Sequence, residues 1–233
     1  MKRALLLLFL IPVCVLSMLT VGYLFTKKEP LFLLRNIRIE GVGQLTSEEV
    51  MRRAYPFLKE SIFGTDVAKV KEAVLAHPFV RDVTIKRVFP FQLVINVSEK
   101  QPSAMWVSPD GVISVLDEQG TPFRPLAKGD VQGLYLIGAT EAPEVKAAFN
   151  QVNQWIAEGI IKKEAISEVL YQEGNITLVG ADGGVEIILG KEEQGQRLKR
   201  AKAVLEDAKR RGLLIRCIDA RFEKGAIVKE RKG

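Results

Sequence analysis

An uncharged apolar run near the amino terminus places the first constraint on this chain. From Ala4 to Phe25 the sequence has no charged residue, and as a helix this run is long enough to cross a hydrocarbon core of about 30 Å. A cleaved signal peptide has a shorter apolar core followed by small residues, a pattern that Tyr23, Leu24 and Phe25 do not fit. We therefore expect a retained transmembrane helix over 4–25, preceded by a short cytoplasmic tail over 1–3.

Charge and cysteine content do not determine on which side of the membrane the rest of the chain lies. Lys2 and Arg3 precede the run and Lys27 and Lys28 follow it, so the positive-inside count is nearly balanced and leaves the topology open. A lipoprotein signal at Cys14 is disfavoured because the preceding residues are not small. Outside the run the chain has a single cysteine, Cys217, which is compatible with an oxidising compartment and is expected to be a buried small hydrophobe.

The size and the basic charge narrow the class of protein. The chain has 233 residues, of which 47% are hydrophobic, enough for two small domains. Its formal net charge of +6 would suggest nucleic acid as a partner for a cytoplasmic protein. For a chain whose bulk lies outside the cytoplasm, we expect contacts with proteins and anionic lipid headgroups instead, and no nucleic acid.

The first segment after the run predicts a strand and two helices. Asn36 to Val42 alternates as a half-buried strand does. Thr46 and Glu49 then have the spacing of a capping box at the start of a helix, and Asp66 is a suitable N-cap for a second helix that ends before Pro78. The apolar stripe of the second helix comprises Val67, Val70 and Val74.

Two alternating segments follow, one on each side of Phe89-Pro90. Val83 and Ile85 alternate with polar residues in the first segment, which predicts a half-buried strand. The apolar positions of the second segment are Phe91, Leu93, Ile95 and Val97. Such a hairpin needs a cover for its apolar face, and the two preceding helices are the nearest elements that can supply it. The expected order is therefore strand, helix, helix, strand, strand.

The remainder predicts a domain rich in strands, with two helices. Strands are expected at Gly111–Leu116 and Leu134–Ile137, and a helix at Pro143–Ala157 has an apolar stripe. That stripe consists of Val145, Phe149, Val152 and Ile156. Three strands separated by turn residues then form a meander. They are Ile166–Tyr171, Ile176–Val179 and Val185–Leu189.

The carboxyl-terminal part predicts a long basic helix and a last hairpin. In the helix, Glu192–Arg211, apolar residues recur on one face, and Gly212 is expected to cap its end. Its expected solvent-exposed cations are Arg197, Lys199, Arg200, Lys202, Lys209 and Arg210. Strands at Leu214–Ala220 and Ala226–Val228 are expected on either side of a turn at Glu223-Lys224-Gly225. A last strand at an open sheet edge leaves N–H and C=O groups that a partner's extended segment can pair with.

Several motifs in this order resemble the FtsQ/DivIB family of bacterial division proteins, and the first block resembles the POTRA domain of that family. Those in the first block are Pro78-Phe79-Val80, Arg87-Val88-Phe89-Pro90 and Glu99-Lys100-Gln101-Pro102. Those that follow are Ala104-Met105-Trp106, Asp117-Glu118-Gln119-Gly120 and the terminal series Ile218, Asp219, Arg221, Phe222, Gly225 and Val228. Phe79 stands where the family often has tryptophan, and Lys229 to Arg231 replace a further aromatic residue of the family.

The resemblance implies an α+β protein of five parts after the cytoplasmic tail. They are a transmembrane helix over 4–25, a juxtamembrane linker over 26–34, a β-α-α-β-β POTRA domain over 35–103, an FtsQ-type β domain over 104–228 with an open C-terminal edge, and a basic tail over 229–233. It also implies a single-pass inner-membrane protein of the division septum, with a cytoplasmic amino terminus and a periplasmic bulk. FtsB-like and FtsL-like division proteins are the implied partners, with Phe222, Gly225 and Val228 in the contact region.

No set of residues in the sequence predicts catalysis, a metal site or a cofactor. His77 is the only histidine, and its place after a helix predicts a capping or surface role in which the helix dipole favours the imidazolium. Lys191 lacks the surrounding residues of a phosphate-binding loop. Glu99 and Asp219 are strand-end carboxylates, which we expect to be solvated or ion-paired. Neither an enzyme activity nor a small-molecule substrate is expected.

Two other classes of function fit parts of the pattern. A POTRA-bearing secretion or outer-membrane assembly factor also binds polypeptides by strand addition, although such a protein ordinarily carries repeated units or a barrel. A membrane-anchored envelope enzyme would need a convergent polar site, which the sequence does not indicate. Phe222 has a second interpretation as well, as a residue that fills the core. Trp106 and Trp155 are expected to pack rather than to bind a ligand.

Overall fold

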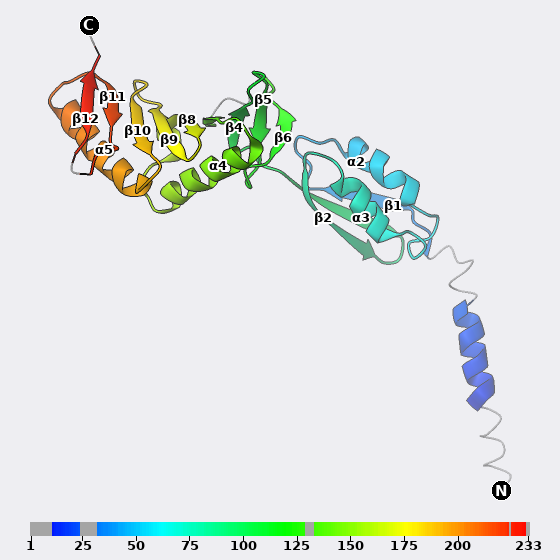
Figure 1. Cartoon of the computed structure of the whole chain (residues 1–233). Coiled ribbons are helices and arrows are strands. Elements are labelled where there is room, and N and C mark those ends of the chain that lie inside the picture. Colours follow the sequence, from blue (N-terminus) through cyan, green and yellow to red (C-terminus); the bar gives the residue numbers. More distant parts are fainter. Residues whose placement is uncertain (1–10, 24–31, 129–132, 224, 232–233) are drawn as a thin grey trace. The chain divides into compact units, whose positions relative to one another are not determined.

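The computed structural model describes residues 11–23, 32–128, 133–223 and 225–231 (Figure 1). It divides into two compact units, Met1–Glu99 and Lys100–Gly233. Residues 11–23 form a helix. Within the described ranges, no helix combines the length and apolar character needed to cross a membrane. The transmembrane helix predicted over 4–25 and the linker predicted over 26–34 lie partly outside the described residues, and the tail over 1–3 lies wholly outside them.

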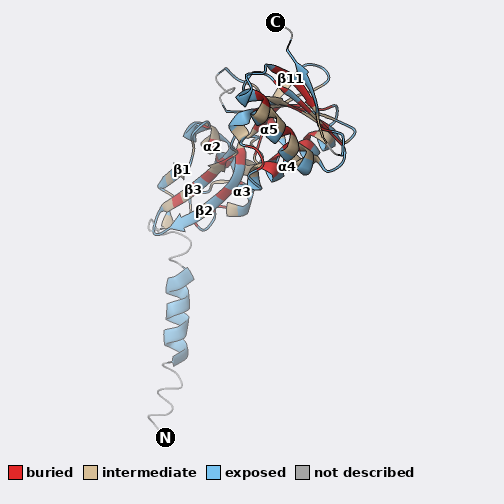
Figure 2. Ribbon diagram, turned by 90° about the vertical axis from the view of Figure 1, so that its left-hand side faces the viewer, coloured by how far each residue is buried: buried red, intermediate tan, exposed pale blue. Residues whose placement is uncertain are grey.

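The first unit contains a three-stranded sheet with β3 (Gln92–Glu99) between β1 (Asn36–Glu40) and β2 (Val80–Val88). β2 and β3 form the predicted antiparallel hairpin, and β1 pairs with β3 in parallel. Buried and less buried residues alternate along β3 (Figure 2). The element order confirms the predicted strand, helix, helix, strand, strand sequence.

Two helices cover this sheet, and both begin at the predicted caps. In α2 (Ser47–Ala54), Thr46 and Glu49 form the complete capping box. In α3 (Val67–Leu75), the Asp66 side chain accepts a hydrogen bond from the Lys69 N–H at 3.2 Å. A short 3₁₀ helix, Tyr55–Phe57, follows α2. The core between helices and sheet includes Val50, Ala54, Val70, Val74, Val83, Leu93 and Ile95.

The second unit is built on a nine-stranded mixed sheet, in the order β12-β11-β10-β9-β8-β7-β4-β5-β6. Its first strands are β4 (Ala104–Val107), β5 (Ile113–Leu116), β6 (Pro122–Pro125) and β7 (Leu136–Gly138). The predicted meander is β8 (Ile166–Gln172), β9 (Asn175–Gly180) and β10 (Glu186–Gly190). The sheet ends with β11 (Ile215–Asp219) and β12 (Ile227–Glu230).

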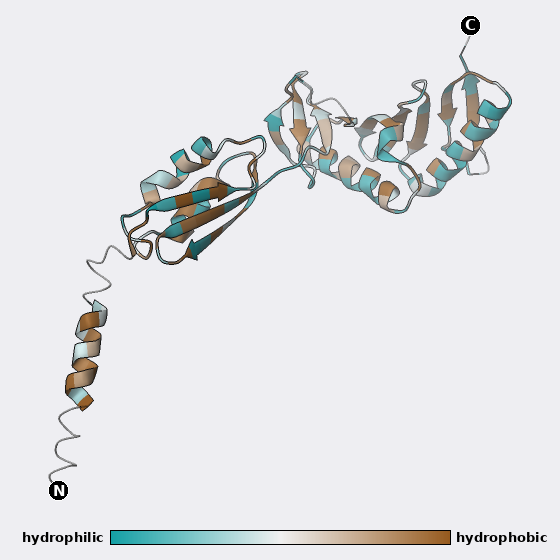
Figure 3. Cartoon of the chain, turned by 180° about the vertical axis from the view of Figure 1, so that it is seen from behind, coloured by the Kyte–Doolittle hydropathy of each residue, from teal (hydrophilic) through white to brown (hydrophobic). Residues whose placement is uncertain are grey.

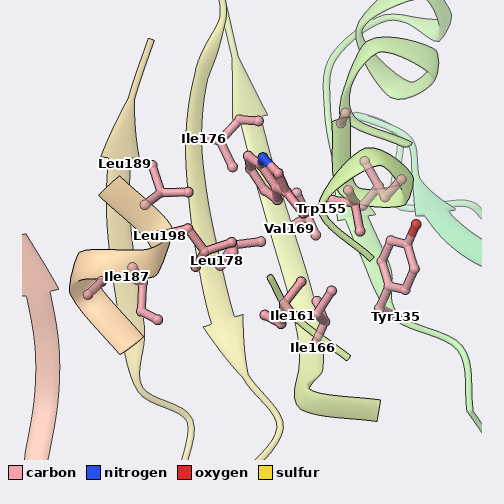
Figure 4. Close-up of a cluster of buried hydrophobic side chains, with 14 of the residues drawn as sticks. Tyr135, Trp155, Ile161, Ile166, Val169, Ile176, Leu178, Ile187, Leu189 and Leu198 are labelled. Atoms are coloured by element: carbon pink, nitrogen blue, oxygen red, sulfur yellow. The ribbon is translucent and has the colours of Figure 1, made fainter. Parts of the chain in front are cut away.

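Helices α4 (Ala142–Ala157) and α5 (Gln194–Arg210) supply side chains to one hydrophobic core with this sheet. A 3₁₀ turn, Lys163–Ala165, leads into β8. Hydrophobic residues recur among hydrophilic ones along α5, as expected for a helix that packs on one face (Figure 3). Trp155 of α4 lies among Val169, Ile176 and other aliphatic side chains (Figure 4). Its exposed fraction of 1% confirms the predicted packing role.

Two predictions about polar residues of α5 are wrong. Arg197 was expected to be solvent-exposed, but its side chain is 11% exposed and donates a hydrogen bond to the Leu189 carbonyl oxygen at 2.8 Å. Lys202 reaches back to the Ile160 carbonyl oxygen at 2.6 Å. Long cationic side chains can cover apolar surface and still satisfy backbone acceptors, which an amphipathic pattern alone does not reveal.

Candidate functional site

The last strand of the second unit forms an open edge of the nine-stranded sheet. Among the strands that the structure describes, β12 pairs only with β11, and Val228 lies opposite Ile218 in the antiparallel register. All four residues of β12 are exposed. An edge strand carries one row of backbone N–H and C=O groups that have no partner within the sheet. The predicted open edge is therefore present at this end of the sheet.

The opposite edge of the same sheet is less suited to pairing. β6 begins at Pro122 and ends at Pro125. Proline lacks a backbone N–H and is common on edge strands that do not accept another strand. β12 contains no proline. Its residues can supply both donors and acceptors.

Helix α5 anchors the turn that leads into β12. The Arg200 guanidinium donates to the carbonyl oxygen of Phe222, and the same nitrogen lies 3.3 Å from the carbonyl oxygen of Gly225. The turn is thereby bonded to a helix that packs on β10 and β11. The sequence predicts Arg200 only as an exposed cation, because nothing in the local pattern indicates a contact with residues this far along the chain.

A charged pair, Asp219 and Arg221, lies where β11 leads into the turn. Arg221 donates from Nε and Nη2 to the two carboxylate oxygens of Asp219, at 2.9 and 2.7 Å. The hydrogen bonds from Arg221 lower the pKa of Asp219 more than partial burial raises it, and the carboxylate in turn raises the pKa of Arg221. Asp219 is thus ion-paired, one of its two predicted surroundings, and it also accepts from the Arg221 N–H at 3.2 Å.

The three predicted contact residues lie within or beside one hairpin. Phe222 is 48% exposed, so it does not fill the core. Gly225 lies in the turn that Arg200 holds. Val228 is 37% exposed in β12, and its neighbour Ile227, which sequence analysis did not select, is 50% exposed. Together these side chains give the edge an apolar surface.

β12 extends beyond the predicted last strand. It continues through Lys229 and Glu230, two residues of the predicted basic tail. The predicted burial of Cys217 in the adjacent strand is confirmed, since that side chain is 5% exposed. Burial also raises the pKa of the Cys217 thiol.

Two residues weighed for chemistry have structural partners in the first unit, and the surroundings predicted for Glu99 are wrong. Glu99 is neither solvated nor ion-paired: it is 9% exposed and accepts from the N–H groups of Gly43, Gln44 and Leu45 at 2.7, 2.8 and 2.9 Å. Burial alone would raise the pKa of Glu99, but these three donors bring it below its ordinary value.

The imidazole of His77 bonds to the backbone of the turn that follows α3. Its Nδ1 accepts a hydrogen bond from the Phe79 N–H at 3.2 Å, which requires an unprotonated nitrogen. Partial burial and the nearby Arg53 lower the pKa of His77, against the opposing effect of Glu49 and Glu99. His77 follows the C-cap Ala76 directly, and its N–H donates to the Val74 carbonyl oxygen at 3.0 Å, so it lies at the end of α3 as predicted. The lowered pKa differs from the expectation that the helix dipole favours the imidazolium, because burial opposes the charged form. In the part of the chain that the structure describes, no three His, Cys, Asp or Glu side chains form a group suited to a metal ion.

Comparison with known proteins agrees with both units. Residues 32–100 match the family model of the FtsQ-type POTRA domain. Residues 104–221 match the model of the carboxyl-terminal region of cell division protein FtsQ/DivIB. The chain belongs to the FtsQ/DivIB family of cell division proteins. The match to the FtsQ/DivIB model ends at Arg221, so Phe222, Gly225 and Val228 lie just beyond it.

Relatives named cell division protein FtsQ span most of the chain. One from a Geobacter species is 28% identical over 220 residues, which cover 89% of this chain and 80% of the relative. One from Myxococcus fulvus is 29% identical over 200 residues, which cover 81% of this chain and 69% of the relative. The match to an Anaeromyxobacter protein, at 26% identity over 197 residues, covers 80% of this chain and 66% of that protein. The two FtsQ/DivIB units thus occur in these relatives in one chain.

Proposed function

We propose that this FtsQ/DivIB-family chain is a membrane-anchored scaffold of the division septum that positions other division proteins and carries out no chemistry. A single helix over 4–25 would anchor it in the inner membrane, with residues 1–3 in the cytoplasm. The POTRA domain, 35–103, and the β domain, 104–228, would lie in the periplasm. The uncharged run and the membership in a division family support this arrangement.

The proposed docking site is the β12 edge, and the proposed occupant is an extended segment of an FtsB-like protein, with an FtsL-like protein beside it. The observation that carries this proposal is that β12 is an edge strand without proline, with all four residues exposed. A partner strand that pairs with its free N–H and C=O groups would gain affinity from backbone hydrogen bonds.

Side chains around the edge would supply specificity. Phe222 and Ile227 each expose about half of their surface. Aromatic and aliphatic anchors of this kind contribute most when a partner covers them fully. The bond from Arg200 to the Gly225 carbonyl would hold the turn in place before the partner arrives, which reduces the ordering cost of binding.

The test is a titration of the full chain with the extracytoplasmic segment of the FtsB homologue from the same cell. Phe222→Ala should weaken binding at least tenfold, as expected for an aromatic anchor worth about 1.4 kcal/mol or more. Leu170→Ala is the matched control, because Leu170 is 44% exposed on β8, an interior strand of the sheet. The control should change affinity less than twofold. Equal affinities for Phe222→Ala and the parent chain would count against this edge as the docking site.

A further inference from the structure

Three phenylalanine rings gather at one end of the first unit, where the chain enters it. The ring centroids of Phe32 and Phe63 are 5.3 Å apart, those of Phe63 and Phe89 are 5.5 Å apart, and those of Phe32 and Phe89 are 6.5 Å apart. The rings come from the entering chain, from the loop before α3 and from the tip of the β2–β3 hairpin. We refer to these three residues as the aromatic cluster.

Backbone and side-chain hydrogen bonds hold the aromatic cluster together. The Ile62 N–H donates to the Phe32 carbonyl oxygen at 2.9 Å, which joins the entering chain to the loop. The Arg87 guanidinium of β2 donates to the carbonyl oxygens of Ile62 and Thr65, both at 2.9 Å, which joins the loop to the hairpin. The three segments that carry the rings are therefore bonded to one another.

The aromatic cluster is nevertheless open to solvent. Phe63 is 53% exposed and Phe89 is 59% exposed. Other apolar residues of the entering chain and the hairpin tip are exposed as well, namely Leu33, Val88 and Phe91. They are absent from the hydrophobic core of this unit. Soluble proteins rarely leave a contiguous apolar surface uncovered, so such a patch indicates a contact with a partner or a membrane.

The length of chain before Phe32 limits how far the aromatic cluster can lie from the apolar run. The run ends at Phe25, and residues 26–31 separate it from Phe32. Even fully extended, that segment reaches about 25 Å at most. If the run spans the bilayer, the aromatic cluster is the part of this unit that is tethered within this distance of the membrane surface. Lys27 and Lys28 in the same segment would be drawn toward anionic headgroups.

We propose that the aromatic cluster docks into the headgroup region of the bilayer in which the chain is anchored. This inference rests on the proposed membrane anchoring and adds a second contact with the same membrane. Aromatic side chains are favoured at the boundary between headgroups and acyl chains. The contact would fix how the POTRA unit stands on the membrane.

The test places a tryptophan in the aromatic cluster of the full chain and reconstitutes it in lipid nanodiscs. Phe89→Trp keeps an aromatic ring at the hairpin tip, and Phe63→Trp provides a second probe in case the first variant does not fold. Gln44→Trp is the matched control, because Gln44 is exposed in the loop that follows β1, beyond the other end of that strand. Nanodiscs are prepared with phosphatidylcholine and phosphatidylglycerol, with or without bromine on the upper acyl chain. The signal from Trp106 and Trp155 is subtracted by using the parent chain.

Emission from the tryptophan at 89 or 63 should fall at least twofold in brominated nanodiscs, and emission from the control should change by less than a fifth. Flotation of the chain with liposomes is measured in parallel and separates the two proposals. Retention of the chain on liposomes without quenching at 89 and 63 would overturn the docking of the aromatic cluster alone. In that case, a protein partner would be the remaining candidate to cover the aromatic cluster. Failure to float would overturn the anchoring and the docking together.

Discussion

A nitrogen of the Arg200 guanidinium on α5 lies 3.3 Å from the carbonyl oxygen of Gly225, in the turn before the edge strand β12. The same nitrogen also donates to the carbonyl oxygen of Phe222. Helix α5, which packs on the sheet, is thus bonded to the turn from which the last strand of the sheet, β12, begins. The edge strand can be exposed and still be ordered.

Removal of the Arg200 side chain should loosen β12 without unfolding the second unit. Arg200→Ala removes hydrogen bonds from a charged donor to two carbonyl groups, a loss of about 1 kcal/mol at a partly exposed site. The amides of β12 that pair with β11 should then exchange about fivefold faster. Hydrogen exchange measured by mass spectrometry on the full chain checks this expectation.

Arg210→Ala is the control for that experiment, because Arg210 is exposed on the same helix and contacts Asp207 at 3.6 Å. It should leave β12 exchange unchanged. Identical exchange in the parent chain and in Arg200→Ala would show that the turn does not depend on α5.

A glycine before α5 should be needed for packing as well as for its backbone angle. Gly190 has φ +73°, and an added Cβ would lie 3.1 Å from Arg197 Nη1 and 3.2 Å from Arg221 Cγ. Gly183 has φ +76° with open space around it. Both alanine variants carry the backbone cost of about 1 kcal/mol, but Gly190→Ala should lower the unfolding free energy by more than Gly183→Ala. Denaturant titrations that give equal losses would contradict the packing role.

Glu99 should stabilise the first unit at neutral pH and less so in acid. Its pKa is lowered in the folded protein, so its contribution is complete above the ordinary glutamate pKa of about 4.3 and is lost as pH falls through the lowered value. Glu99→Gln should cost about 2 kcal/mol at pH 7, and the difference from the parent should shrink in acid. Exchange of the Leu45 amide, corrected for its intrinsic pH dependence, gives the measurement.

Glu60→Gln is the matched control, an exposed glutamate of the same unit. It should leave Leu45 exchange unaffected at every pH. A Glu99→Gln deficit that stays constant from pH 7 to pH 3 would mean that the charge of Glu99 is not what holds the loop of residues 43–45.

His77 should titrate below the ordinary histidine pKa of about 6.5, because partial burial and Arg53 disfavour its charged form. Any stability that it contributes is therefore complete above the ordinary value and declines as pH falls through the lowered one. His77 is the only histidine, so one imidazole resonance in an NMR titration reports the pKa directly.

Two substitutions that should move the pKa of His77 in opposite directions test the cause of its shift. Arg53→Gln should raise the midpoint, and Glu49→Gln, which keeps a capping-box residue, should lower it. A midpoint above 6.5, or movement of both variants in the same direction, would be inconsistent with this environment.

Elements set by local patterns could be predicted from the sequence. The capping box of Thr46 and Glu49, the Asp66 cap and the alternation in β2 and β3 depend on residues close in the chain, and all are present. Strands β4 and β6 were missed because β4, with the sequence AMWV, has no alternation of apolar and polar residues, and β6 is bounded by proline. The insertion of β7 between β4 and β8 is a parallel, non-local pairing, which no local pattern specifies.

The candidate site could also be predicted only in part, because some of its contacts join residues far apart in the sequence. The β11–β12 hairpin and the open edge follow from alternation and turn residues, and the structure has both. The contacts of Arg200 and Arg197 with distant carbonyl groups could not be predicted, since a helical pattern separates apolar from polar positions but does not say which cation folds back. The role of Glu99 at the loop of residues 43–45 likewise depends on tertiary structure.

Photocrosslinking in dividing cells tests whether a division protein docks at the β12 edge. A photoreactive residue replaces Ile227 on the β12 edge, and the matched control replaces Arg124 on the opposite edge strand, β6. We expect position 227 to capture a small single-span division protein, identified by mass spectrometry, and position 124 not to capture it. Capture of that protein from both positions alike, or from neither, would contradict docking at the β12 edge.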